Sequence, residues 1–171
     1  MPDQLRDLAR SAAGQVVAIV VLFAVLGVLA GLVWYAVWDA PTGVVSQGEW
    51  FPSPYDEGQR ADFSGTALYV LVALVTGLVG GAVSALLLAR HELVTVAAVV
   101  VGSCLAALLM FVVGTALGPP DPSELARSAS DGTELEGHLH VSGASPFTAL
   151  PFGALLALIV VFLGTAGRRE R

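Results

Sequence analysis

The stretch Gly65–Ala89 reads GTALYVLVALVTGLVGGAVSALLLA and contains no Asp, Glu, Lys, Arg or His. A helix rises 1.5 Å per residue, so about 20 apolar residues cross the hydrocarbon core of a bilayer. This stretch is therefore long enough to span a membrane. Small residues recur in it at every fourth position, as Ala73, Gly77, Gly81 and Ala85. Because such a row lets another helix approach closely in lipid, we expect the other spans to assemble around this one.

Three further apolar runs share this character, which gives four predicted spans at about 15–38, 65–89, 93–117 and 146–166. Hydrophobic residues make up 56% of the 171-residue chain and charged residues only 13%, a composition that no soluble domain of this size needs. The sequence therefore predicts an all-α fold, a four-helix transmembrane bundle that forms one integral-membrane domain over residues 1–171.

Small residues are spaced in the same way in all four spans, which predicts helix-packing faces throughout the bundle. The positions expected to pack are Gly27, Gly31, Gly77, Gly81, Ala85, Gly102, Ala106, Gly153 and Ala157. The chain lacks Lys and Asn and has few Ile, which indicates a GC-rich bacterial genome. That bias also enriches Ala, Gly and Val, so it is an alternative explanation for part of the spacing.

The arginines predict the orientation of the chain. Six of the eight flank the termini and the connection between the second and third spans, whereas Arg60 and Arg127 lie in the long loops 39–64 and 118–144. Because cytoplasmic segments carry an excess of Arg and Lys, both termini are expected in the cytoplasm of a bacterial plasma membrane. The two loops carry ten acidic residues against two arginines, a formal charge of −8, and are expected outside the cell.

Aromatic residues cluster where the first loop and the first span meet the membrane surface. Trp34, Tyr35 and Trp38 end the first span, and Trp50 and Phe51 lie in the loop among prolines. Since Trp and Tyr favour the headgroup depth, we expect these aromatic residues to rest among the lipid headgroups. The alternative for the loop is a stiff segment that docks a partner.

The second and third spans are joined only by Arg90, His91 and Glu92. Short connections join elements that are adjacent in space, so we expect these two spans to be antiparallel neighbours. The two halves of the chain share one plan, a span, a long acidic loop and a second span. A parallel internal duplication would produce that plan, although no residue-level match accompanies it.

One stretch of the second loop carries groups that bind metals. Alternation over residues 134–141, ELEGHLHV, predicts a short strand or hairpin with Glu134, Glu136, His138 and His140 on one face. Carboxylates and imidazoles are zinc ligands, but neighbours on one strand face lie about 7 Å apart, too far for four of them to share one ion. We therefore expect a water-exposed strand face and no metal, with a metal-binding or pH-sensing site as the alternative.

The predicted spans contain no Asp, Glu, Lys, Arg or His, although such residues mark ion and proton pathways in membranes. This argues against an active transporter, a proton-coupled device and an intramembrane metalloprotease. No phosphate-binding loop, dinucleotide fingerprint or HExxH motif is present, so neither an enzyme nor a cofactor is expected. The net charge of −6 gives no support to nucleic-acid binding. The polar residues left in the spans are Thr76, Ser84, Thr95, Ser103 and Thr115.

Short motifs flank the first loop. The first span ends in GVLAGLVW (27–34), the sequence Ala40-Pro41-Thr42-Gly43-Val44 follows, and the loop closes on Ala61-Asp62-Phe63. In these motifs, in size and in its four spans, the chain resembles the actinobacterial integral-membrane family of unknown function catalogued as domain of unknown function 2567. It departs from that pattern at Phe63-Ser64, where Asp-Gly is expected. The resemblance implies the architecture and a Gram-positive source, and it carries no functional residues.

Taken together, these features predict a small non-enzymatic interaction, accessory or scaffold protein of the plasma membrane. It is expected to associate with lipid and with a membrane-protein partner or a second copy, through its small-residue helix faces and its outer loops. The first alternative is an oligomeric channel or small-solute transporter. The second is an extracytoplasmic protein that senses metal or pH through residues 134–140.

Overall fold

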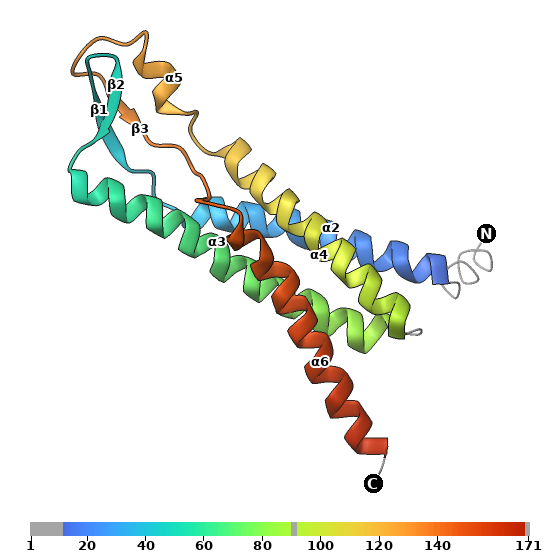
Figure 1. The fold of residues 1–171 in the computed structure, drawn as a ribbon. Coiled ribbons are helices and arrows are strands. Elements are labelled where there is room, and N and C mark those ends of the chain that lie inside the picture. The colour runs from blue at the N-terminus through green and yellow to red at the C-terminus, as the bar shows by residue number, and fades with distance from the viewer. Residues whose placement is uncertain (1–11, 90–91, 170–171) are drawn as a thin grey trace.

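The computed structural model describes residues 12–89 and 92–169. Four long helices form an elongated bundle with a small sheet at one end, hereafter the sheet end (Figure 1). The elements in chain order are α2 (Ala12–Val37), β1 (Thr42–Ser46), β2 (Glu49–Pro52), α3 (Tyr55–Val83), the π-helix η1 (Ser84–Leu88), α4 (Glu92–Leu117), α5 (Pro122–Ala126), β3 (Glu134–Glu136), the 3₁₀-helix η2 (Ser145–Thr148) and α6 (Ala149–Arg169).

Four stretches are long and apolar enough to cross a membrane: Ala12–Val37, Phe63–Leu88, Glu92–Ala126 and Ser145–Thr165. In the third, α4 ends at Leu117 before two prolines, so α4 is its membrane-spanning part. Exposed Val and Leu side chains cover the outside of all four helices, as expected for surfaces that face lipid. The length and apolar character of these helices confirm the prediction of a polytopic membrane protein with four spans.

The all-α prediction is incomplete, because the two long loops build a three-stranded antiparallel sheet in the order β2-β1-β3. A short strand or hairpin was expected in the second loop. Strand β3 lies there, but the hairpin is formed by β1 and β2 of the first loop. Its two-residue turn is Gln47-Gly48, in which both residues have positive φ (55° and 77°). That conformation matches the twist of a hairpin, and the β-branched and aromatic residues on either side favour strands.

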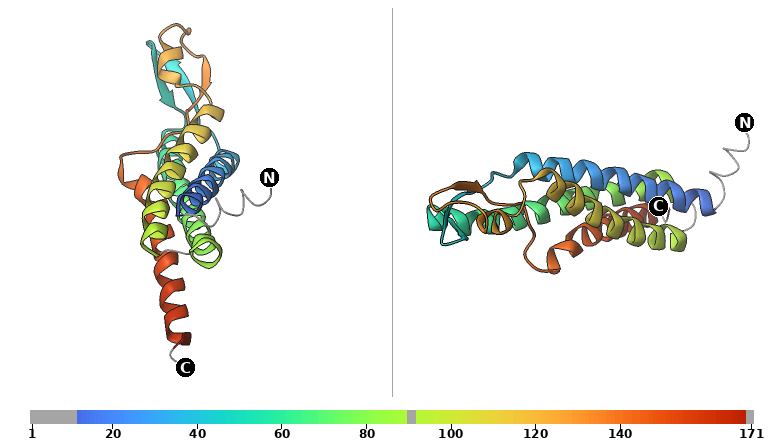
Figure 2. Two further views of the ribbon diagram at one scale, coloured as in Figure 1. Left: turned by 90° about the vertical axis from the view of Figure 1, so that its right-hand side faces the viewer. Right: turned by 90° about the horizontal axis from the view of Figure 1, so that it is seen from above.

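The helix α2 packs along α4, and the two run in the same direction (Figures 1 and 2). Near one end, Gln15 Nε2 donates a hydrogen bond to Thr95 Oγ1 at 2.6 Å. Further along, a Cβ on Gly27 would lie 2.6 Å from the carbonyl oxygen of Ala106. The contacts therefore advance in step along both helices, and the backbones meet where α2 has no side chain.

The helix α6 packs along α3 in the same parallel sense. Gly77 lies against the backbone of Leu150, and Gly81 lies against that of Ala154. The C-terminal half of α6 then diverges from the other helices (Figure 1). Each tight pair thus combines the corresponding helices of the two halves of the chain.

The second and third spans are antiparallel, as expected (Figure 1), but α3 and α4 touch little along their lengths, so they are not each other's main packing partners. A short connection fixes only where two helix ends meet. Which faces meet is decided by side-chain size, and the glycines of α3 accept α6 instead.

The residues expected to pack occupy contacts within the chain. A Cβ on Gly153 would lie 2.6 Å from the carbonyl oxygen of Leu74, and one on Gly102 would lie 3.1 Å from the ring of Phe23. Gly31 lies against the backbone of Met110. The side chains of Ala106 and Ala157 are buried, and that of Ala85 is half-buried against the core.

Aromatic side chains contributed by all four spans meet near the sheet end. The rings of Trp34 and Tyr69 pack edge to face at 5.1 Å, and Phe147 lies 5.4 Å from Tyr69 and 5.3 Å from Phe111. Trp34 Nε1 donates to the carbonyl oxygen of Gly65 at 2.9 Å. Edge-to-face pairs add stability beyond the area that they bury. We call Trp34, Tyr69, Phe111 and Phe147 the aromatic cluster.

The expectation that Trp34 and Trp38 lie among the headgroups is therefore wrong. Trp34 is 0% exposed and Trp38 is 8% exposed, whereas Tyr35 is 40% exposed. The indole of Trp34 finds its hydrogen-bond acceptor on α3, which removes its need for the polar membrane surface.

We predict that Gly27→Ala destabilises the bundle by about 1–3 kcal/mol, because the added methyl group would overlap the backbone of Ala106. Chemical unfolding in mild detergent measures this change. The matched control is Gly164→Ala in α6, where an added Cβ meets open space. Equal unfolding midpoints for the two variants would contradict the backbone contact.

We also predict that Tyr69→Phe lowers the free energy of unfolding by about 0.6–1.7 kcal/mol, the range measured for hydrogen bonds between membrane helices. Tyr69 Oη donates to the carbonyl oxygen of Ala107 at 2.8 Å, a buried bond between α3 and α4. The control Tyr35→Phe changes a tyrosine on the outside of α2 and should shift the midpoint by less than about 0.5 kcal/mol.

Candidate functional site

The two long loops fold together into one unit, which we call the sheet module (residues 39–54 and 118–144). Val45 N–H donates to Thr133 O at 2.9 Å, and Gly132 N–H donates to Val45 O at 2.8 Å. A third such bond, at 2.7 Å, joins Gly137 N–H to Pro41 O. These backbone hydrogen bonds join segments far apart in the sequence, so neither loop is an independent flap.

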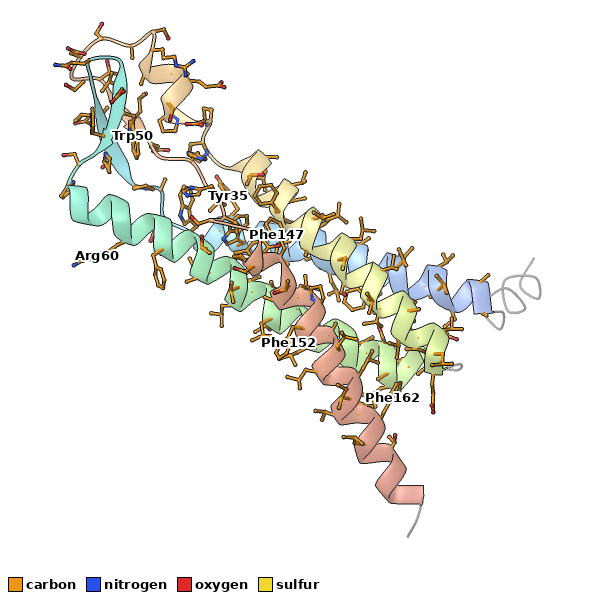
Figure 3. All side chains as sticks on the ribbon, in the orientation of Figure 1. Tyr35, Trp50, Arg60, Phe147, Phe152 and Phe162 are labelled. Carbon is orange, nitrogen blue, oxygen red and sulfur yellow. The ribbon has the colours of Figure 1, made fainter. Side chains whose placement is uncertain are left out.

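One face of the sheet is buried. Val45 is inaccessible, and the indole of Trp50 lies over Gly43 so that its Nε1 donates to Leu135 O at 3.1 Å. The buried residues Pro122 and Ala126 of α5 belong to the same module. The prediction that Trp50 rests on headgroups is therefore wrong: its ring bridges β2 to β3 (Figure 3).

The opposite face is open to solvent, and we call it the exposed sheet face. Phe51 and Glu134 pair with Val44 from either side, and Glu136 pairs with Thr42. Phe51 is 48% exposed and is the large aromatic side chain of this face. The members of this face are Thr42, Val44, Ser46, Glu49, Phe51, Glu134 and Glu136.

Two histidines lie next to α5, beyond the end of β3. The rings of His138 and His140 stack with centroids 4.8 Å apart, and His138 Nδ1 lies 3.8 Å from Asp121 Oδ1. The same Asp121 oxygen accepts the backbone N–H of Ser123 at 2.9 Å, which caps α5. This hydrogen bond is the main reason that the pKa of Asp121 is held below its usual value, and the two imidazoles add to the effect.

The four possible metal ligands do not converge. Strand β3 ends at Glu136, so Glu134 and Glu136 lie on the exposed sheet face while His138 and His140 stack near Asp121. Within residues 12–89 and 92–169, no group of three or more His, Cys, Asp or Glu side chains is placed to hold a metal ion. The strand predicted over residues 134–141 thus stops before Gly137, which lies against Pro41.

The sheet module is fixed to the bundle by the segment after β3. Leu139 is buried against Gly65 of α3 and against Gly118, which directly follows α4. Ser142 N–H donates to Thr66 Oγ1 at 3.1 Å. The buried side chain of Leu139 and this hydrogen bond thus hold the sheet module in a fixed position on the spans.

Polar side chains inside the bundle serve contacts within the protein. Ser103 and Thr115 donate to carbonyl oxygens of their own helix, and Gln15 binds Thr95. Ser84 is fully buried in η1, and among the described residues its Oγ has no hydrogen-bond partner. Sequence reasoning missed Gln15 as a structural residue, because it stands at the predicted start of the first span.

No family model, curated protein or solved structure matches the chain. The resemblance to the actinobacterial family stays a prediction from its short motifs, and it assigns no role to any residue described above.

We predict that Asp121→Ala lowers the stability of α5 by about 1 kcal/mol, the usual effect of losing an N-cap. Because folding lowers the pKa of Asp121, the carboxylate stabilises the module above the pKa of the unfolded chain. This contribution is lost as pH falls through the folded value. The protection factors of the α5 amides, which correct the exchange rates for their intrinsic dependence on pH, should therefore fall on acidification in the wild type, and should already be low at neutral pH in the variant.

The control for this experiment is Glu124→Gln, which changes an exposed carboxylate in the same short helix. It should leave the response to pH unchanged. Slow exchange in Asp121→Ala at neutral pH would show that the cap does not hold α5.

Proposed function

We propose that the protein is a non-enzymatic interaction protein of the bacterial plasma membrane, in which four spans anchor the sheet module and the exposed sheet face binds a protein partner. The observation that carries this proposal is the exposed sheet face itself. It presents Phe51 beside Val44 on one side, and on the other side of β1 it places Glu134 beside Val44 and Glu136 beside Thr42.

The proposed orientation places the sheet module outside the cell and both termini in the cytoplasm. Six of the eight arginines belong to the termini and to the connection between the second and third spans. The sheet module, which is acidic, then lies on the extracytoplasmic side of the membrane, where Arg and Lys are not enriched. A partner on this face is an extracytoplasmic protein or the outer part of another membrane protein.

The exposed sheet face has the anatomy of a small binding surface. Binding energy in interfaces concentrates at a few central apolar or aromatic residues, and polar residues at the rim set specificity and association rate. Here Phe51 supplies the aromatic anchor and the glutamates supply the rim. We therefore infer that the partner segment combines an apolar pocket with Arg or Lys.

Other surfaces support this placement of the partner site. The small residues of the spans already contact helices of the same chain, so they are occupied. Two exposed sheet faces of identical acidic charge would repel each other, which disfavours a dimer through this face. The aromatic cluster fills the space between the spans near the sheet end, which favours an anchoring role over a solute path.

The test replaces Phe51 with a photoreactive phenylalanine analogue and irradiates membranes of the native host. We expect one discrete protein adduct, which weakens at high salt and disappears when Glu134→Lys and Glu136→Lys are added. The same analogue at Leu125, an exposed residue of α5, is the matched control and should give no such adduct.

An adduct that is unaffected by charge reversal, or adducts with lipid only, would contradict the proposed partner site. Hydrogen exchange of strand β1 in the charge-reversed protein should remain slow. This measurement separates loss of binding from loss of the fold.

A further inference from the structure

We propose that a groove between α3 and the start of α6 binds one anionic phospholipid from the leaflet at the sheet end. The groove is open on one side and has a volume of about 660 Å³, within the range of pockets that hold small ligands. Its walls are formed by the sheet-end half of α3 and by residues from Ser142 to Ala149. This site is distinct from the exposed sheet face, and the inference does not depend on the proposed partner.

The lining of the groove changes in polarity along the bundle axis. Deeper in the predicted membrane it consists of Val70, Leu71 and Leu74. Toward the sheet end, the hydroxyl groups of Thr66 and Ser145 line its mouth. An acyl chain fits the deep part, and hydroxyl groups can donate hydrogen bonds to the ester and phosphate oxygens of a lipid.

Arg60 supplies a positive charge above this mouth. It precedes Phe63, the first residue of the span, by three residues, or about 4.5 Å along the helix axis. It also precedes the groove residue Ala67 by seven positions, so the two lie on nearly the same face of α3. Its side chain projects from α3 on the side opposite the hairpin (Figure 3).

The local charge of Arg60 selects the lipid. The long loops carry a formal charge of −8, which opposes an anionic headgroup, so the preference rests on Arg60, one of their two arginines with Arg127. Arg127 lies on the sheet module beside α5, whereas Arg60 lies above the groove. An arginine at headgroup level can bind the phosphate of either lipid through two parallel hydrogen bonds. An anionic headgroup is favoured because its net negative charge attracts the guanidinium, whereas the cation of a zwitterionic headgroup cancels that attraction.

A helix from a second copy is a poorer occupant for this groove. Helices pack tightly in membranes against small residues, and Gly77 and Gly81 of α3 already contact α6. The open wall carries the larger side chains Val70, Leu71 and Phe63, which is 77% exposed. A flexible acyl chain adapts to such an uneven surface more readily than a rigid helix does.

The experiment titrates the purified protein in mild detergent with phosphatidylglycerol or with phosphatidylcholine of the same acyl chains, and counts bound lipid by native mass spectrometry. We expect one phosphatidylglycerol to bind in preference to phosphatidylcholine. Arg60→Gln should weaken phosphatidylglycerol binding about fivefold and remove the preference. The matched control Arg127→Gln should leave both affinities unchanged.

A second variant tests the acyl chain. Ala67→Trp adds bulk at an exposed position inside the groove, so it should reduce the binding of both lipids while the thermal midpoint stays near that of the wild type. The same change at Val75, which lines a separate groove between α2 and α3, should not affect binding.

Several results would overturn the inference. These are equal binding of the two lipids by the wild type, an Arg60→Gln variant that behaves like the wild type, and competition by glycerol phosphate without acyl chains. A dimeric mass that Ala67→Trp converts to a monomer would instead assign the groove to a second copy of the chain.

Discussion

Direct contact between helix backbones, within the α2–α4 and α3–α6 pairs, fixes the rest of the structure. In lipid no hydrophobic drive brings helices together, so packing and hydrogen bonds between helices must supply the stability of the bundle. Glycine permits the closest approach, and Gly27 and Gly77 lie where a side chain would collide with the partner backbone. The aromatic cluster then joins the two pairs near the sheet end.

This pairing explains why two loops far apart in the sequence form one sheet. The first loop leaves α2 and the second leaves α4, and these helices are neighbours. The loops return into α3 and α6, which are neighbours as well. Both loops therefore begin and end side by side, which places β1 next to β3 and lets Leu139 close the sheet end of the bundle. The exposed sheet face and the lipid groove both follow from that arrangement.

Sequence reasoning reached the four spans because length and apolar character are local properties. It did not reach the helix pairing, because small residues occur in every span and no local signal says which faces meet. The short connection at Arg90 suggested the wrong packing partners for the same reason. The hairpin was missed because Trp50 and Phe51 have the composition of a membrane-interface segment, and only the tertiary structure shows that Trp50 bonds to Leu135. The sequence places Arg60 in a loop, and its position above the groove follows from the start of α3 at Tyr55.

The most direct test of this account is cysteine crosslinking in membranes, in a background where Cys104→Ala removes the native thiol. A short bifunctional thiol reagent should join the pair Gln15→Cys and Thr95→Cys, because these side chains touch across the α2–α4 contact. It should not join Val79→Cys and Val101→Cys, which would lie at similar depth if α3 and α4 formed a packed hairpin. The opposite pattern would contradict the parallel pairing of helices on which the sheet module and both proposed sites depend.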